Sequence, residues 1–149
     1  MTSNIGSEFL ANQKEGEDVE AVRPYVMAEM KTKFRPEFLN RIDEIILFQR
    51  LRREQMAAIV DIQIARLQKL LAERKLTLVL DDQARTWLAN RGYDPTYGAR
   101  PLKRVIQKSV QDPLAEQLLA GRIKDGETVK LTVRDGTLVV NGQPVKAAA

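Results

Sequence analysis

Arg100 is a cation in an unusual position. It lies in the stretch GYDPTYGARPLKR, residues 92–104, directly before Pro101. Proline suits the first turn of a helix, because its ring presets φ and it has no N–H to leave unpaired. The pattern therefore predicts a helix that starts at Pro101, with Arg100 as its N-cap. Small polar residues are preferred at that position, and a cation there faces the positive end of the helix dipole, so an arginine needs a separate reason.

The positive charge of the chain is concentrated around this stretch. Residues 91–108 contain five basic side chains and one acidic side chain, which gives the window a net charge of +4. The whole chain also has a net charge of +4, so the remaining residues balance. A concentrated positive field predicts an anionic partner, such as phosphate or nucleic acid. The alternative is a solvated helix face, which explains such clusters more often than not.

The residue types that are missing exclude several kinds of chemistry. The 149 residues include no histidine and no cysteine, which excludes disulfides, thiol catalysis, Cys/His zinc sites and histidine-based triads. The acidic residues are scattered beside basic ones, so we predict surface ion pairs and no metal site. No GxxxxGKS/T motif is present, so this chain cannot cradle the phosphates of a nucleotide by itself. No apolar run approaches the ~20 residues of a membrane span, which favours a cytoplasmic protein without membrane contact.

The elements that would position these residues fall into two parts. Residues 1–50 contain a helix pattern with Val26, Met30 and Phe34 inward, and a short apolar run, EIILF at 44–48, that predicts a buried strand. Few of these pieces can shield one another. We therefore interpret residues 1–50 as a fragment of a larger α/β domain.

Residues 51–149 have the pattern of a self-sufficient α+β domain. Apolar positions predict a helix of about five turns after Leu51, an alternating strand in KLTLVLD, and a helix capped by Asp81 or Asp82 and closed by Gly92. Asp112-Pro113 predicts a capped start for a further helix. Asp135-Gly136 predicts the two-residue turn of a terminal hairpin, whose strands need helices on one side. The inward residues expected for the long helix are Met56, Ile59, Val60, Gln63, Leu67, Leu70 and Leu71.

Three stretches, in order, resemble landmarks of the second ATPase module of ClpB-type chaperones, which are AAA+ members of the Clp family. They are TSNIG, FRPEFLNRID and GYDPTYGARPLKR, and the resemblance extends over essentially the whole chain. It implies a helical small lid domain with a small β-sheet at 51–149, preceded by part of the large ATPase domain at 1–50. The interval between the first two stretches has no Ile/Leu-Gly-Phe/Leu tripeptide for docking a peptidase, which favours the disaggregase branch.

The resemblance also implies roles for particular residues. Asn4 corresponds to sensor 1, which orients the attacking water, Arg41 to the arginine finger, and Arg100 to the sensor-2 arginine aimed at a phosphate of ATP. Gly98 and Ala99 would lie against the nucleotide, bound as Mg-ATP in the parent protein. Implied partners are further copies of the chain in a hexameric ring, unfolded or aggregated proteins, and a DnaK-type chaperone system reached through other parts of the protein.

Each role has a simpler structural alternative. Arg100 could pair with a nearby carboxylate, Arg41 with Asp43 or Glu44, and Asn4 could form an Asx-turn before Gly6. Two other functions also remain, namely a basic α+β module that binds nucleic acid and a domain for oligomerisation alone. Aromatic residues make up 5% of the chain, which argues against a platform for stacking single-stranded nucleic acid.

Overall fold

The computed structural model describes residues 1–13 and 17–145, which form two compact units, Met1–Arg50 and Leu51–Ala149. The first unit contains α1 (Ser7–Asn12), a 3₁₀ turn at Val19–Val22, α2 (Arg23–Lys33) and α3 (Pro36–Leu39). Both α2 and α3 have proline in the first turn, where its missing N–H costs nothing. α2 presents Val26 inward as expected, and Val26 is fully buried, while Met30 and Phe34 are half-buried.

The strand predicted at residues 44–48 is wrong. The segment forms no strand among the residues described, and Ile46 and Phe48 are 63% and 76% exposed. A strand needs a neighbour to pair with its N–H and C=O groups, and the first unit offers none within its described part. A short apolar run is therefore not enough to make this segment a strand in the described part of the unit.

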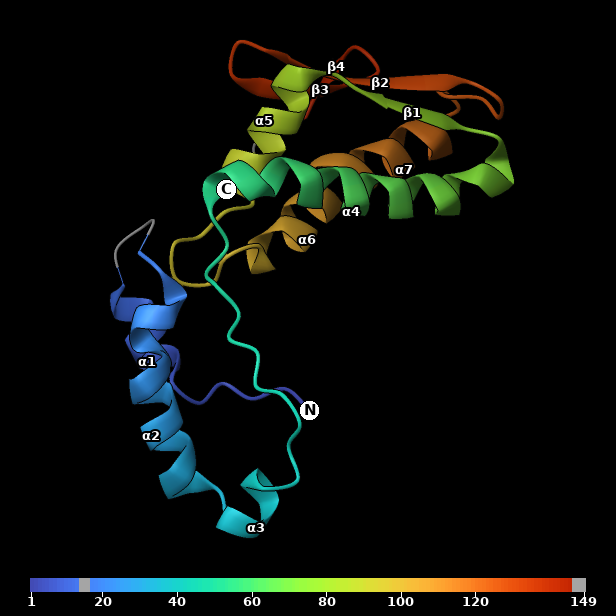
Figure 1. Ribbon diagram of the computed structural model, residues 1–149. Coiled ribbons are helices and arrows are strands. Elements are labelled where there is room, and N and C mark those ends of the chain that lie inside the picture. Colours follow the sequence, from blue (N-terminus) through green and yellow to red (C-terminus); the bar gives the residue numbers. More distant parts are fainter. Residues whose placement is uncertain (14–16, 146–149) are drawn as a thin grey trace. The chain divides into compact units, whose positions relative to one another are not determined.

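The second unit packs helices on one face of a four-stranded sheet (Figure 1). Its elements in chain order are a 3₁₀ turn at Arg53–Gln55, α4 (Met56–Leu71), a 3₁₀ turn at Ala72–Arg74, β1 (Thr77–Leu80), α5 (Asp82–Arg91), α6 (Arg100–Ile106), a π-helical segment (Gln107–Gln111), α7 (Asp112–Leu119), β2 (Thr128–Arg134), β3 (Thr137–Val140) and β4 (Gln143–Pro144).

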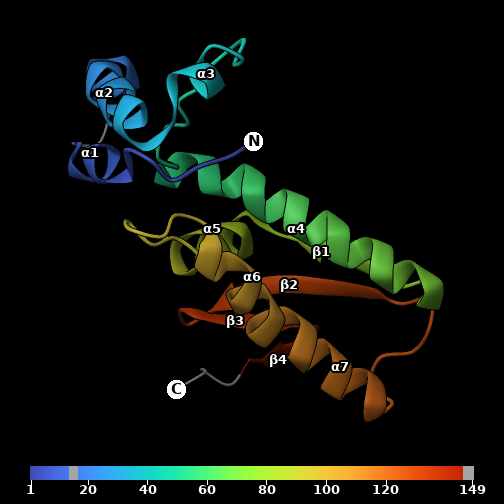
Figure 2. The same cartoon turned by 90° about the horizontal axis from the view of Figure 1, so that it is seen from below.

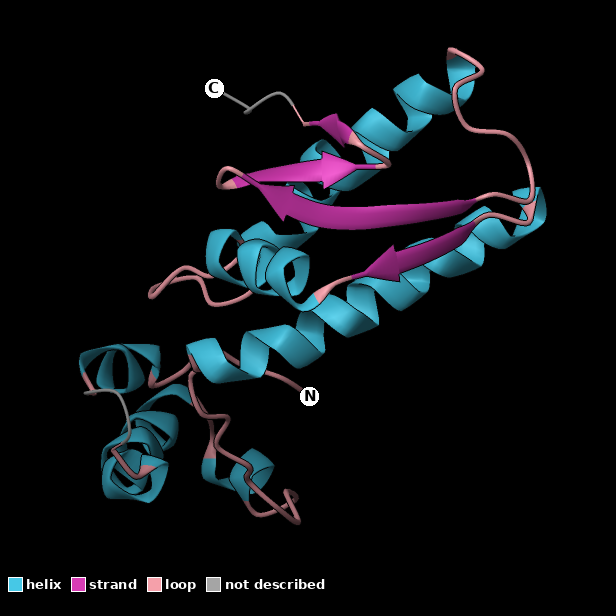
Figure 3. Ribbon diagram, turned by 90° about the horizontal axis from the view of Figure 1, so that it is seen from above, coloured by secondary structure: helices cyan, strands magenta, loops and turns pink. Residues whose placement is uncertain are grey.

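The strands lie in the order β1-β2-β3-β4, as Figure 3 shows. β1 and β2 are parallel, and the helices from α5 to α7 provide the crossover connection that a parallel pair needs. The other pairs are antiparallel hairpins. Asp135-Gly136 forms the turn between β2 and β3 as predicted, with positive φ at both residues. β4 was not predicted, although Asn141-Gly142 gives the same turn signal and also has positive φ at both residues.

α4 supplies one wall of the core. Met56, Val60 and Leu67 are buried as expected, but Leu70 is 70% exposed and Ile64 is buried in its place. Residues at spacings of three and four lie on one face of a helix, and the face of α4 that meets the core carries Val60, Ile64 and Leu67. Leu70 lies off this face and is therefore exposed. The remaining core comes from α5 to α7 and the sheet, and includes Leu76, Leu88, Leu102, Ile106, Val110, Leu114, Val129, Leu131, Leu138 and Val140.

Polar side chains tie the helices to each other and to the sheet. Arg85 of α5 donates to Asp61 of α4 at 2.8 Å, and this hydrogen bond raises the pKa of the guanidinium. Gln117 of α7 is buried and donates its amide N–H to the carbonyl of Val140 at 3.0 Å. Asp81 caps α5, accepting from the N–H of Ala84 at 2.7 Å, which confirms the predicted cap.

The helix predicted to begin at Asp112-Pro113 is present as α7, but Asp112 is not its cap. The backbone stays helical from α6 through the π segment into α7, and Asp112 lies inside this run with no capping role (Figure 2). Proline in a helix interior would clash with the carbonyl four residues earlier, which here belongs to Ser109. Ser109 lies in the π segment, whose wider turn accommodates the proline ring without ending the helix.

Candidate functional site

The loop before Arg100 is closed by its own hydrogen bonds. Asp94 and Gly98 pair as an isolated antiparallel bridge, with N–H to carbonyl distances of 2.9 and 2.7 Å. The side chain of Asp94 turns into the loop, where Oδ1 accepts from the N–H groups of Thr96 at 2.7 Å and Tyr97 at 2.8 Å. These four hydrogen bonds hold the loop in one conformation.

Gly98 and Ala99 connect this loop to α6. Gly98 has φ +62°, a left-handed conformation that favours glycine, and its N–H and carbonyl both belong to the bridge. Ala99 is the N-cap of α6, so Arg100 is its first helical residue and Pro101 follows it within the first turn. The predicted N-cap at Arg100 is thus wrong by one residue, because Ala99 and not Arg100 leaves the helical region of φ and ψ.

Arg100 is exposed and has no carboxylate partner within the described part of the chain. The alternative in which it pairs with a nearby carboxylate does not hold there. No side chain caps the start of α6, and the helix dipole is unfavourable for a cation at that end. A guanidinium in this position gains nothing from its own fold, and it presents planar N–H donors that match phosphate oxygens.

α6 is held by one face and carries charge on the other. Leu102 and Ile106 are buried, while Lys103, Arg104 and, just after α6, Lys108 are exposed. Gly92, at the end of α5, lets the two helices approach closely, since a Cβ there would lie 2.9 Å from the Cα of Leu102. The backbone at Arg100 is therefore held by the packing of α6 as well as by the loop.

Arg53 is a further cation at this loop that sequence reasoning missed. Its guanidinium lies 5.4 Å from the ring centroid of Tyr93, in cation–π geometry. The two residues are far apart in the sequence, so no local pattern could have paired them. Trp87, by contrast, packs against the core, and its indole N–H donates to the carbonyl of Gly136 at 2.8 Å.

Asn4 and Arg41 lie in the first unit. Asn4 is exposed, and its backbone carbonyl accepts from Ser7 at 3.2 Å, so the turn before Gly6 is not built on the Asn4 side chain. Arg41 is exposed just after α3, where its N–H donates to the carbonyl of Phe38 at 3.1 Å. Arg41 forms no ion pair with Asp43 or Glu44 among the residues described, so that alternative does not hold either.

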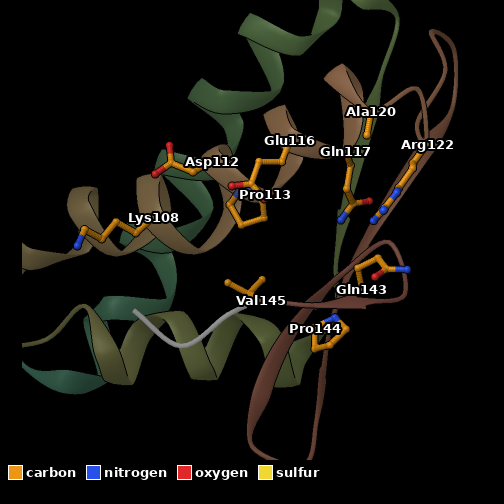
Figure 4. Close-up of a pocket in the computed structure, with 10 residues that line it drawn as sticks. All are labelled: Lys108, Asp112, Pro113, Glu116, Gln117, Ala120, Arg122, Gln143, Pro144 and Val145. Carbon is orange, nitrogen blue, oxygen red and sulfur yellow. The ribbon is translucent and has the colours of Figure 1, made fainter. Parts of the chain in front are cut away.

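A separate cleft of about 600 Å³ lies between α7 and β4 (Figure 4). Its walls are partly apolar, from residues such as Pro113, Pro144 and Val145, and the rest of the lining includes both charged side chains and the amides of Gln117 and Gln143. None of the predicted site residues borders it. Over the described ranges, 1–13 and 17–145, no cluster of three metal-ligating side chains is found.

A family model for the C-terminal D2-small domain of the ClpB protein matches residues 51–131. The chain belongs to the ClpB family. The matched range contains the long helix, the Asp94–Gly98 loop and Arg100, which confirms the fold expected for a small ClpB domain, helices on a small sheet.

Chaperone relatives match the whole chain. Chaperone protein ClpB of Rhodopseudomonas palustris is 62% identical over 148 residues, and that of Brucella suis is 64% identical over 148 residues. Each alignment covers 99% of this chain, which spans 17% of the length of these ClpB relatives. The solved S. cerevisiae Hsp104-ADP complex is similar at a TM-score of 0.78 and 38% identity, covering 89% of this chain and 23% of that one.

The comparisons with ClpB proteins leave the individual roles of Asn4, Arg41 and Arg100 as predictions. In the part of the chain that the structure describes, no helix is long and apolar enough to span a bilayer.

Proposed function

We propose that this chain provides the C-terminal part of the second ATPase module of a ClpB chaperone that disaggregates proteins. Support comes from the identity of more than 60% to chaperone ClpB relatives along 99% of the chain. In this proposal, ATP hydrolysis drives the unfolding and threading of aggregated polypeptides. The chain contributes sensor and arginine-finger residues and a surface for packing between subunits.

One observation carries the assignment of Arg100 as a phosphate sensor. The loop Asp94–Gly98 and the packing of α6 hold its backbone, while its guanidinium is exposed and unpaired within the described residues. An exposed, permanently charged fork beside the small residues Gly98 and Ala99 fits a phosphate group of ATP. A contact of this kind that differs between ATP and ADP would couple the position of the small domain to the nucleotide state.

Arg41 and Asn4 would act from the large domain. An arginine donated by a neighbouring subunit stabilises charge in the transition state of phosphoryl transfer and contributes about 10³–10⁵ in rate. At ~1.4 kcal/mol for each factor of ten, this corresponds to roughly 4–7 kcal/mol. Asn4 would orient the attacking water through its side-chain amide. Within the described ranges this amide forms no hydrogen bond to another residue.

The first unit is proposed to be part of the large ATPase domain. This unit has an apolar cavity of about 270 Å³, lined by residues such as Ile5, Met30 and Phe34. Together with the exposed side chains of Ile46 and Phe48, it supports the proposal that another part of the large domain packs here. The phosphate-binding loop and the groups that hold Mg²⁺ would lie in the rest of that domain. The 149-residue chain alone is therefore not expected to hydrolyse ATP.

The proposed working form is a cytoplasmic hexameric ring that takes unfolded or aggregated proteins as substrates. Contact with a DnaK-type chaperone system would be made by other parts of the protein.

The alternative of a nucleic-acid-binding module rests on the exposed Lys103, Arg104 and Lys108 of α6 and the segment after it. Fluorescence anisotropy with labelled single-stranded RNA and DNA separates the two, since a chaperone segment should show no salt-dependent binding at micromolar protein.

Arg100→Ala tests the proposal, with Lys103→Ala as a matched control that removes an exposed cation from the same helix. In full-length ClpB, Arg100→Ala should weaken ATP binding, slow hydrolysis and reduce the difference in assembly between ATP and ADP. Thermal melting of the 149-residue chain should hardly change, since the Arg100 side chain forms no hydrogen bond or ion pair within the described residues. A large drop in melting temperature with normal ATPase activity would show that Arg100 is structural.

A further inference from the structure

Glu29 of α2 binds the backbone next to Asn4. The N–H of Gly6 donates to Oε2 of Glu29 at 3.1 Å, across 23 residues of sequence. This N–H belongs to the peptide group that joins Ile5 to Gly6, directly after the Asn4–Ile5 peptide. The contact therefore fixes the orientation of the Ile5–Gly6 peptide group, two residues from Asn4, the predicted water-orienting residue.

Gly6 is also fixed by its shape. It has φ +76°, and a Cβ on it would lie 2.6 Å from Cγ2 of the buried Val26. Only glycine meets both demands, so the turn Asn4–Gly6 lies directly against α2. Within the turn, the carbonyl of Asn4 accepts from Ser7, which begins α1, at 3.2 Å. Two residues of α2, Val26 by packing and Glu29 by a hydrogen bond, thus determine how the turn lies.

The same helix holds the chain that follows Arg41. Arg23, at the start of α2, donates Nη1–H to the carbonyl of Ile45 at 3.2 Å and pairs with Glu20. The hydrogen bond from Arg23 lowers the pKa of the Glu20 carboxyl, which is the electrostatic sign of this pairing. α2 is therefore bonded at one end to the segment after Arg41 and near its middle to the turn that carries Asn4.

We propose that Glu29 is a positioning residue for Asn4 in ATP hydrolysis. The inference rests on the proposed function, in which Asn4 orients the attacking water. In this proposal Glu29 acts without contacting the nucleotide or the attacking water, by accepting the Gly6 N–H so that the turn holds the Asn4 amide in one direction. Positioning of this kind affects the chemical step more than the binding of substrate, because it determines how often the water is aligned.

The test uses full-length ClpB that contains this chain, with the phosphate-binding loop of its first ATPase module inactivated, so that only the second module is measured. Glu29→Ala removes the acceptor, whereas Glu29→Gln keeps an oxygen that can accept from Gly6. Glu29→Ala should lower kcat roughly three- to tenfold, as expected for the loss of one hydrogen bond, with KM unchanged within about twofold. Glu29→Gln should retain nearly full kcat. Lys31→Ala, an exposed change on the same helix, is the matched control and should leave both constants unchanged.

A double-mutant cycle with Asn4→Ala separates positioning from general damage. If Glu29 acts through Asn4, the double variant should be no slower than Asn4→Ala alone, and all variants should form rings of normal size. Effects that multiply, or a Glu29→Gln variant as slow as Glu29→Ala, would overturn the inference. A slow Asn4→Ala beside a normal Glu29→Ala would overturn the role of Glu29 alone. A normal Asn4→Ala would overturn the role proposed for Asn4, and the role of Glu29 with it.

Discussion

Asp94 and Gly98 exchange both of their backbone hydrogen bonds, at 2.9 and 2.7 Å, and so close the short loop that ends two residues before Arg100. The Asp94 side chain adds two more hydrogen bonds inside the loop. Together they fix the backbone from which the guanidinium projects. A site that is ordered before the ligand binds avoids the entropy cost of ordering it during binding.

Asp94→Ala should loosen this loop and weaken the binding of ATP by the second module of full-length ClpB. The change leaves the N–H groups of Thr96 and Tyr97 without their side-chain acceptor. The closed conformation of the loop should lose about 1–2 kcal/mol of stability. Asp94→Asn keeps an acceptor oxygen and should bind ATP nearly normally. Titration with a fluorescent ATP analogue measures the difference, and equal affinity for the alanine variant and the wild type would refute a role for the loop in aiming Arg100.

Gly92→Ala should strongly destabilise the second unit. The new Cβ would lie 2.4 Å from Cδ1 of Leu102 and 2.9 Å from its Cα, so the helix that carries Arg100 would have to move. Overpacking of this kind costs typically 1–3 kcal/mol, and a clash with backbone places the expected loss at about 3 kcal/mol. Urea unfolding of the 149-residue chain measures the loss. Adding Leu102→Ala should not restore stability, since the clash with the backbone of residue 102 persists and a buried leucine is lost.

Gln68→Ala should expose the free edge of the sheet. The Gln68 amide donates to the carbonyl of Leu76 at 2.7 Å and accepts from the N–H of Leu78 at 2.6 Å, which occupies backbone groups at the edge strand β1. Losing both hydrogen bonds should cost about 1–3 kcal/mol in urea unfolding and leave groups that can pair with another chain. Sedimentation at increasing concentration should then show self-association, with Lys69→Ala, an exposed change on the same helix, as the control. A variant as stable and as monodisperse as that control would contradict the prediction.

Arg41→Ala should reduce turnover in full-length ClpB far more than nucleotide affinity, because its proposed contact forms mainly in the transition state. Rings mixed from Arg41→Ala subunits and subunits without a phosphate-binding loop should regain part of the activity if the arginine acts on a neighbour. Arg41→Lys serves as the second variant and should also be slow, since an ammonium lacks the planar fork. Normal ATP hydrolysis by rings of Arg41→Ala subunits would refute the proposal that Arg41 is the arginine finger.

Local signals predicted much of the second unit correctly. The Asp81 cap, the strand at Thr77–Leu80 and the Asp135-Gly136 turn follow from residues a few positions apart, and the structure confirms each one. The same rules failed where distant residues decided the outcome. Residues 44–48 have the composition of a strand but no partner among the described residues, and Asp112 begins α7 without capping it, because the helical π segment leads directly into that helix.

The sequence by itself determined which residues could act. The absence of histidine and cysteine, the charge concentrated in residues 91–108, and the three stretches around Asn4, Arg41 and Arg100 are properties of the chain as written. Only the tertiary structure decided how they are held. The Arg53–Tyr93 contact and the hydrogen bond from Gly6 to Glu29 join residues that lie far apart in the sequence. Such contacts form only when packing brings distant segments together, and no local spacing in the sequence encodes them.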